Sequence, residues 1–247
     1  MGHEQCAVEM AGCALPHIRA IFISIGIRYN ENEINTLTHR HTAEGFYSEE
    51  KHLDNTLHYY DAIASDFVQG TVHVNMESLY QLFLKYLPQG AAICDLGCGS
   101  GRDSKHFLEK GYAVAAIDGS AELCKIASAY IGREVRNITF DQIDYREVFD
   151  GIWACASLLH VSSLQLPSIF EKIARSLKPG GYLYVSFKHG TFEGERNGRH
   201  FTDLTEDGLA GIIRQITDLQ IIETAVGNDM REGRQQEKWL NAILKKQ

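Results

Sequence analysis

Three glycines at alternate positions, with an aspartate just before them, form the segment of this sequence best suited to bind a ligand. Residues 95–101 read DLGCGSG, and they follow a short apolar run and precede a run with helical spacing. Glycines in this pattern permit a tight turn and let the backbone approach a ligand without interference from a Cβ atom. In open α/β sheets such a loop lies at the carboxyl end of the first strand, where ligands bind. The sequence therefore predicts a ligand site at residues 95–101.

The spacing of the glycines argues against two common nucleotide-binding loops. A dinucleotide site prefers G-x-G-x-x-G, whereas this loop reads G-x-G-x-G and has Arg102 at the position of the third glycine. The pattern G-x-x-x-x-G-K-[ST] of a P-loop does not occur in the chain. A nicotinamide or flavin site is therefore disfavoured, and a P-loop is excluded.

A second carboxylate, Asp118, supports the ligand site. It ends the next apolar run and could accept two hydrogen bonds from a ribose diol. Asp95 could accept a hydrogen bond from an ammonium group or orient the amides of the loop. The alternative is that Asp95 and Asp118 only cap turns, as aspartate often does.

The elements that must position these residues alternate between strands and helices. Apolar runs predict strands at 91–96, 112–117, 135–140, 151–157 and 182–187, and helical periodicity predicts helices at 53–69, 74–87, 102–110, 121–131 and 166–177. A helix at 205–216 and strands at 219–225 and 239–244 are expected to follow. This order predicts an α/β fold, a doubly wound and mostly parallel sheet with helices on both faces.

Four segments in order resemble the class I S-adenosylmethionine-dependent methyltransferases. They are DLGCGSGR at 95–102, AAID at 115–118, FDGIWACASLLH at 149–160 and LKPGG at 177–181. Within that class, the first two segments are similar to tellurite-resistance-type and other small-molecule methyltransferases. The resemblance covers about residues 59–247. It implies a Rossmann-like sheet of seven strands whose last strand is antiparallel.

The resemblance also implies which residues bind S-adenosylmethionine. The glycine-loop residues would line its methionine part, Asp118 would hold its ribose, and Asp141 would meet its adenine. Tyr60, in the segment YYDAIA at 59–64, would close over the cofactor, because an aromatic face attracts a sulfonium cation. The alternative for this tyrosine pair is a place in the core of an amphipathic helix. The cofactor-binding residues expected are Tyr60, Asp95, Gly97, Cys98, Gly99, Gly101, Asp118, Gly119, Asp141, Ile143 and Ala156.

Methyl transfer from a sulfonium is an in-line displacement that needs alignment and exclusion of water but no metal. A general base helps only when the acceptor starts protonated. His160 follows the predicted fourth strand, and an unperturbed imidazole titrates near neutrality, so it is the candidate base. The alternative is a packing or turn role, since a lone histidine proves little.

The glycine-rich stretch 188–203 contains cationic and aromatic side chains that suit an anionic or planar acceptor. We expect it to form a mobile lid. The acceptor-binding residues expected are Tyr59, Lys188, Arg196, Arg199 and Phe201. The alternative is a solvated loop whose arginines pair with Glu193, Glu195 and Asp203.

Composition limits the classes of partner. Lys and Arg total 24 and Asp and Glu total 32, a formal net charge of −8, which disfavours binding to a phosphate backbone. No apolar run is long enough to span a membrane, and six cysteines at irregular spacing suit a reducing compartment, so we expect a cytoplasmic protein. The spacing of His3, Cys6, Cys13 and His17 matches no usual zinc pattern. No metal site is expected.

Two parts of the chain are expected. Residues 1–52 lack sustained periodicity and read as an N-terminal extension, partly disordered, and residues 53–247 as the methyltransferase domain. The predicted function is methyl transfer from S-adenosylmethionine to a small molecule by a monomer or homodimer. The alternatives are an RNA or protein methyltransferase and a non-catalytic module that binds the cofactor.

Overall fold

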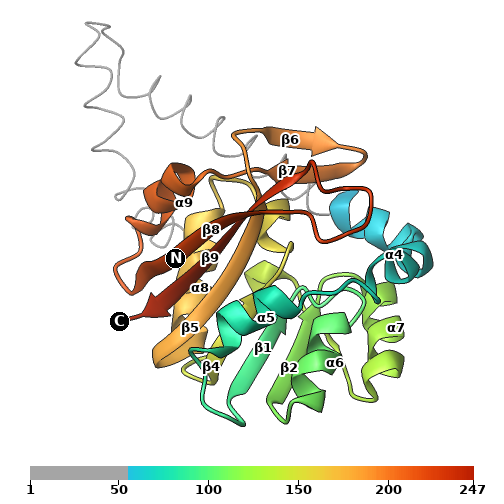
Figure 1. Cartoon of the computed structure of the whole chain (residues 1–247), viewed down its shortest axis with the longest axis horizontal. Helices are drawn as coiled ribbons and strands as arrows, with labels where there is room; N and C mark the ends of the chain where they lie inside the picture. Colours follow the sequence, from blue (N-terminus) through green and yellow to red (C-terminus); the bar gives the residue numbers. More distant parts are fainter. Residues whose placement is uncertain (1–54) are drawn as a thin grey trace, which may run out of the picture. The chain divides into compact units, whose positions relative to one another are not determined.

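A seven-stranded sheet organises residues 55–247, the part of the chain that the computed structural model describes (Figure 1). Its strands are β1 (Ala92–Leu96), β2 (Ala113–Asp118), β3 (Arg136–Asn137), β4 (Phe149–Ala154), β5 (Leu177–Lys188), β8 (Leu219–Asn228) and β9 (Lys238–Lys246). Their order across the sheet is β3-β2-β1-β4-β5-β9-β8. All neighbours from β3 to β5 are parallel, whereas β9 runs antiparallel to both β5 and β8. The predicted sheet, with its antiparallel last strand, is confirmed.

Helices precede and connect these strands. They are α4 (Ala64–Thr71), α5 (Glu77–Leu84), α6 (Arg102–Glu109), α7 (Ala121–Ile131), α8 (Leu166–Ser176) and α9 (Glu206–Ile213), with short 3₁₀ turns at Phe140–Gln142 (η1) and Leu158–His160 (η2). A further helix, here called the lead helix, spans residues 55–62. Two antiparallel strands, β6 (Glu193–Arg196) and β7 (Arg199–Thr202), form a separate hairpin.

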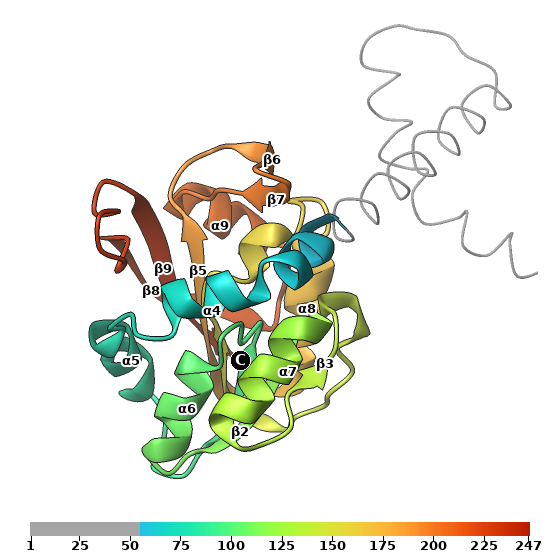
Figure 2. The ribbon, with the colours of Figure 1, turned by 90° about the vertical axis from the view of Figure 1, so that its right-hand side faces the viewer.

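Successive residues of the central strands face opposite sides of the sheet, as the pleat requires. In β4, Ile152 packs in an apolar cluster with α8 and α9, whereas the neighbouring Trp153 packs with α5 and α6. Both side chains are buried. The two views of Figures 1 and 2 show the sheet between these helices. Burial on both faces explains why these strands read as continuous apolar runs.

Several predicted elements differ in detail, and the strand expected at 135–140, for example, is reduced to β3 (Arg136–Asn137). The expected helix at 53–69 is interrupted at Ile63, which separates the lead helix from α4. The stretch 188–203, predicted as a loop, contains the β6–β7 hairpin, whose two-residue turn is Asn197-Gly198 with φ angles of 52° and 77°. Positive φ at both positions is the geometry of a type I′ turn, which Asn-Gly favours.

Some expectations concern residues that the structure does not describe. The extension at 1–52 and the residues weighed for zinc, His3 to His17, lie outside residues 55–247. Within 55–247, no helix is long and apolar enough to cross a membrane. The same residues contain no group of three side chains placed to hold a metal ion.

Candidate functional site

The glycine loop, residues 97–101, leaves β1 and turns sharply into α6. Gly97, Gly99 and Gly101 all have positive φ, at 77°, 53° and 77°, and Gly101 caps the start of α6. The amides of Gly97 and Cys98 both donate to the Ile117 carbonyl of β2, at 2.9 and 3.0 Å. The loop is therefore held against the carboxyl ends of β1 and β2 in a shape that favours glycine.

Close packing adds a second reason for glycine at position 97. A Cβ atom there would lie 2.4 Å from the Cβ of Ser157, which follows β4. At Gly99 it would lie 3.1 Å from the ring of Phe67 on α4. The loop thus lies between the end of β4 and α4. Side chains at positions 97 and 99 would fill the space beside Ser157 and Phe67.

Asp118, the last residue of β2, organises the loop with its carboxylate. Its Oδ2 accepts a hydrogen bond from the Gly99 amide at 2.8 Å, and its Oδ1 accepts one from the Ser120 amide at 2.9 Å. Burial raises the pKa of this carboxyl, and the amide hydrogen bonds oppose that rise. A carboxylate has about four acceptor sites, so Asp118 can still accept from a ligand diol.

Asp95 has a different environment from the one predicted. It is buried, accepts a hydrogen bond from the Ser104 hydroxyl at 2.6 Å, and does not line the cavity described below. Burial, followed by the nearby Asp103 carboxylate, raises its pKa. The structure therefore places Asp95 under the glycine loop, where it ties β1 to α6.

The lead helix is fixed over the loop by an aspartate. Asp61 accepts hydrogen bonds from the Ser120 hydroxyl at 2.6 Å and from the Glu122 amide at 3.2 Å, at the start of α7. Beneath it, a Cβ on Gly119 would lie 2.7 Å from Leu57. This attachment places the neighbouring Tyr60 at the cavity.

His160, in η2 after β4, forms hydrogen bonds through both ring nitrogens. Its Nδ1 lies 2.7 Å from the His200 carbonyl oxygen, and its Nε2 lies 2.9 Å from the Tyr60 hydroxyl. A carbonyl only accepts, so Nδ1 carries the hydrogen and Nε2 accepts from Tyr60. Burial lowers the pKa of His160 to about 4, which keeps the ring neutral at pH 7.

One cavity of about 360 Å³ connects these groups. The predicted residues that line it are Tyr60, Gly97, Cys98, Gly99, Asp118, Gly119, Ala156, His160, Lys188, Arg199 and Phe201. Those that the structure does not bring to it are Tyr59, Asp95, Gly101, Asp141, Ile143 and Arg196. Most of the predicted set therefore converges on one space.

The cavity wall next to Asp118 is formed by different residues from those predicted. Asp141 is exposed and Ile143 is buried, and the cavity is lined instead by Thr139 and Phe140 just before them. Strand β3 has only two residues and is followed by the η1 turn, so no regular period marks which side chain faces inward.

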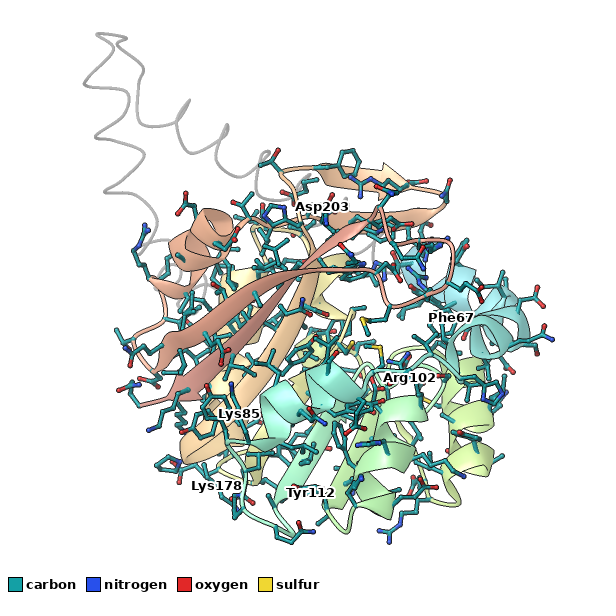
Figure 3. The ribbon with its side chains drawn as sticks, in the orientation of Figure 1. Phe67, Lys85, Arg102, Tyr112, Lys178 and Asp203 are labelled. Atoms are coloured by element: carbon teal, nitrogen blue, oxygen red, sulfur yellow. The ribbon has the colours of Figure 1, made fainter. Side chains whose placement is uncertain are left out.

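A buried polar cluster beside the loop was missed by sequence reasoning. The Asp103 carboxylate accepts from Arg102 Nε at 2.6 Å, from the Tyr80 hydroxyl at 2.6 Å and from Trp153 Nε1 at 2.8 Å. The charge of Arg102 and these hydrogen bonds hold the pKa of Asp103 below its usual range despite burial. Figure 3 marks Arg102 and Phe67 where the loop, α4 and α6 approach one another.

The β8–β9 connection supplies the opposite end of the cavity and was also not predicted. Asp229 accepts hydrogen bonds from Arg231 Nε at 2.9 Å and from Trp239 Nε1 at 3.1 Å. Tyr184 of β5 donates to Asn241 of β9 at 2.7 Å. All five side chains line the cavity, and only long-range strand pairing brings them together.

The two hairpin arginines have different partners. Arg196 forms a two-pronged ion pair with Asp203, at 3.0 and 2.8 Å, and lies outside the cavity lining, which corrects its predicted place at the acceptor. Figure 3 marks Asp203 beside the hairpin. Arg199 lines the cavity, donates to the Tyr60 hydroxyl at 3.3 Å, and lies over the ring of Tyr59 at 4.4 Å.

Comparisons with known proteins agree with this architecture. Residues 94–185 match the family model described as "Methyltransferase domain". YqeM of Bacillus subtilis, named as a candidate methyltransferase, is 30% identical over 142 residues, 54% of this chain and 57% of that protein. A ubiquinone biosynthesis O-methyltransferase of Xylella fastidiosa is 36% identical over 109 residues, 39% of this chain and 42% of that protein. The chain thus spans about half the length of the curated relatives it matches.

Solved structures share the fold. A Burkholderia thailandensis 1,6-didemethyltoxoflavin-N1-methyltransferase, crystallised with that compound and S-adenosylhomocysteine, superposes with a TM-score of 0.58 at 22% identity. The match covers 76% of this chain and 89% of that one. A Methanosarcina mazei structure described as a SAM-dependent methyltransferase gives a TM-score of 0.60 at 21% identity, and the match covers 68% of this chain and 97% of that one. The resemblance drawn from the sequence motifs is confirmed.

Proposed function

We propose that this chain, which carries a class I S-adenosylmethionine-dependent methyltransferase domain, transfers the cofactor's methyl group to a small molecule. One observation carries the proposal. A single cavity of about 360 Å³ runs from the glycine loop to the β8–β9 connection, and volumes of a few hundred Å³ are typical of small-molecule sites. The net charge of −8 also favours a small acceptor over RNA.

The residues present fit the cofactor. The glycine loop forms a cradle that a Cβ at Gly97 would fill, and the hydroxyl of Ser157 beside it is buried without a hydrogen-bond partner. Such orphaned groups usually meet a ligand or water. We assign the methionine part to the loop, the ribose to Asp118 and the adenine to the wall at Thr139 and Phe140. When bound, the cofactor supplies an electrophilic methyl group on a sulfonium centre.

The residues around the other end would hold the acceptor and exclude water. Tyr184, Trp239 and Phe201 provide aromatic surface, and Ser186 and Asn241 provide polar groups among them. A mostly apolar wall with a few placed polar groups orients a small ligand. Closure by the lead helix and the hairpin would align the acceptor for displacement.

A proton leaving the acceptor would pass through Tyr60. The Tyr60 oxygen would accept that proton as its own hydroxyl hydrogen moves to Nε2 of His160, across the 2.9 Å hydrogen bond. The Nδ1 hydrogen bond to the His200 carbonyl then stabilises the charged ring. In this assignment His160 is a base that acts through Tyr60.

Calorimetry with S-adenosylmethionine and S-adenosylhomocysteine tests the premise, and we expect both to bind. Absence of binding to both compounds would refute the proposal, along with the RNA, protein and non-catalytic alternatives. Transfer of a radiolabelled methyl group, screened against metabolite pools, RNA and protein, then separates those alternatives. We expect label in the metabolite pool, and the Gly97→Ala protein provides the background.

The proposal includes a cytoplasmic location and a monomer or homodimer, as expected from the sequence. Size-exclusion chromatography with light scattering measures the oligomeric state, and fractionation of the source cells locates the protein. The irregular spacing of the six cysteines supports the cytoplasmic location, because it suits a reducing compartment.

A further inference from the structure

The positively charged side chains that line the cavity differ in how they are neutralised. Arg102 pairs with Asp103 at 2.6 Å, Arg231 with Asp229 at 2.5 Å, and Arg234 faces Glu237 at 3.7 Å. Lys188 also forms an ion pair with Glu237. Arg199 also lines the cavity, but no carboxylate among residues 55–247 lies within ion-pair distance of it.

Arg199 is held in place mainly by aromatic rings. Its guanidinium carbon lies 4.4 Å from the ring centre of Tyr59, 5.1 Å from that of Phe201 and 5.6 Å from that of Tyr60. Of its five N–H hydrogens, one is donated to the Tyr60 hydroxyl at 3.3 Å. Its Nε is buried and has no hydrogen-bond partner.

The guanidinium of Arg199 is therefore a rigid hydrogen-bond donor that has no anionic partner among residues 55–247. Placing a guanidinium among aromatic rings removes part of its hydration, and an unpaired N–H in such a place is costly. A planar carboxylate or similar oxygen anion matches the guanidinium fork and can accept two hydrogen bonds at once. Aromatic faces next to the fork would also accommodate a flat ring attached to that anion.

We propose that the cavity recognises its methyl acceptor by an anionic oxygen group, with the Arg199 guanidinium as the anion-binding subsite. The acceptor class is then a small, flat organic acid. This inference rests on the proposed function and specifies its substrate class.

The carboxylate of the cofactor is the other possible source of an anion. The position of Arg199 favours the acceptor, because Arg199 belongs to the hairpin and contacts Phe201 and Tyr60. No hydrogen bond or ion pair joins Arg199 to the glycine loop in the described residues. The two sources can be separated in protein saturated with S-adenosylhomocysteine. That protein already contains the cofactor's carboxylate, so any further anion that binds occupies the acceptor's place.

Benzoate and benzamide are suitable probes, because they have nearly the same shape and differ in charge. Calorimetry at pH 7.5 would measure their binding to protein saturated with S-adenosylhomocysteine. We expect benzoate to bind about tenfold more tightly than benzamide, the preference typical of a charge-assisted pair. In Arg199→Gln this preference should fall to about twofold or less, and Arg199→Lys should keep part of it because the charge remains without the fork.

A matched control makes the same change in net charge elsewhere. Arg214→Gln, on the exposed residue that ends α9 outside the cavity lining, should retain the full preference for benzoate. Thermal denaturation of each variant shows whether it is folded. The comparison of the two probes on the unaltered protein needs no variant at all.

Three results would overturn the subsite. They are equal or absent binding of the two probes to the unaltered protein, a preference that survives in folded Arg199→Gln, and a parallel loss of S-adenosylhomocysteine affinity in that variant. The last result would assign Arg199 to the cofactor's carboxylate. A protein that does not bind S-adenosylhomocysteine refutes the proposed function itself, so the two failures are distinguishable.

Discussion

The Tyr60 hydroxyl donates its hydrogen to Nε2 of His160 across 2.9 Å, although the two residues are 100 positions apart. The His200 carbonyl fixes the tautomer, because it can only accept from Nδ1. The lone pair of the imidazole therefore faces Tyr60. In the proposed mechanism a base at this position would act through the tyrosine, so His160 and Tyr60 would act as one unit.

The first prediction tests this unit with an acceptor that loses a proton on methylation. Tyr60→Phe and His160→Ala should each lower kcat by about 100-fold, and the double variant should lose little more, because residues that act together are not additive. Steady-state kinetics with an acceptor found in the methyl-transfer screen provides the measurement. Full turnover by His160→Ala at saturating acceptor would end the base assignment.

The second prediction concerns the pH dependence of stability. The pKa of folded His160 is about 4, below the ordinary value near 6.5, so between these pH values the unfolded chain binds a proton that the folded chain does not. Stability contributed by the neutral ring is therefore complete above pH 6.5 and is lost as the pH falls toward 4. Between pH 7 and pH 5 the free energy of unfolding of the unaltered protein should fall by about 2 kcal/mol more than that of His160→Gln.

Urea denaturation at several pH values measures this difference. Other groups that titrate in the same range affect both proteins, so the comparison isolates the ring. Parallel pH profiles for the two proteins would contradict the neutral, buried state of His160.

The third prediction concerns Gly97. Replacement by Ala places a Cβ 2.4 Å from Ser157 in a left-handed backbone, so the loop must shift. Gly132→Ala is a matched control, because Gly132 has a φ of 68° but no atom within 4 Å of the added Cβ. The control should lower the free energy of unfolding by about 1 kcal/mol, because alanine is strained in the left-handed conformation, and it should retain its affinity for S-adenosylhomocysteine. Gly97→Ala should lower the free energy of unfolding by more than the control does, and it should weaken the affinity for S-adenosylhomocysteine at least about tenfold. Equal losses in both variants would show that the contact with Ser157 is unimportant.

The fourth prediction separates two aspartates. Asp118→Asn replaces one acceptor oxygen by an NH₂ group, so either the Gly99 or the Ser120 amide loses its partner. Its affinity for S-adenosylhomocysteine should fall about tenfold or more. Asp141→Asn should leave the affinity unchanged, because Asp141 is exposed and outside the cavity lining. Calorimetry on both variants decides the assignment, and a larger loss in Asp141→Asn would restore that residue to the adenine site.

The fifth prediction concerns the cluster around Asp103. In Asp103→Asn the guanidinium of Arg102 remains largely buried without its carboxylate, and breaking a buried pair in this way costs about 3 to 5 kcal/mol. Glu109→Gln removes a carboxylate from an exposed pair with Lys105 and should cost less than about 0.5 kcal/mol. The free energies of unfolding from urea titrations provide the test. Similar costs for the two variants would mean that the cluster contributes little.

Sequence reasoning was most successful where local chemistry determines structure. The glycine spacing is itself a backbone requirement, and Asp118 follows from its place at the end of β2. The alternation of strands and helices determined the sheet, because burial on both faces leaves a clear apolar pattern. These features depend on residues close together in the chain.

The misplaced residues depend on contacts that the sequence does not reveal. Arg196 and Arg199 are opposite one another across the hairpin turn, yet one pairs with Asp203 and the other reaches Tyr60. Composition alone could not distinguish them. The Asn197-Gly198 turn between them was a recognisable hairpin signal, and it would have replaced the predicted loop by two strands. The partners of Asp103 come from α5 and β4, which no local pattern connects.

The position of β9 between β5 and β8 has a consequence for protein synthesis. A ribosome delivers the glycine loop and Asp118 early, whereas Trp239 and Asn241 of β9 emerge only after all the other strands. The pairing of β5 with β9 must wait for those residues, so the two ends of the cavity become available in a fixed temporal order. A nascent chain therefore possesses every residue assigned to the cofactor before it can complete the wall assigned to the acceptor.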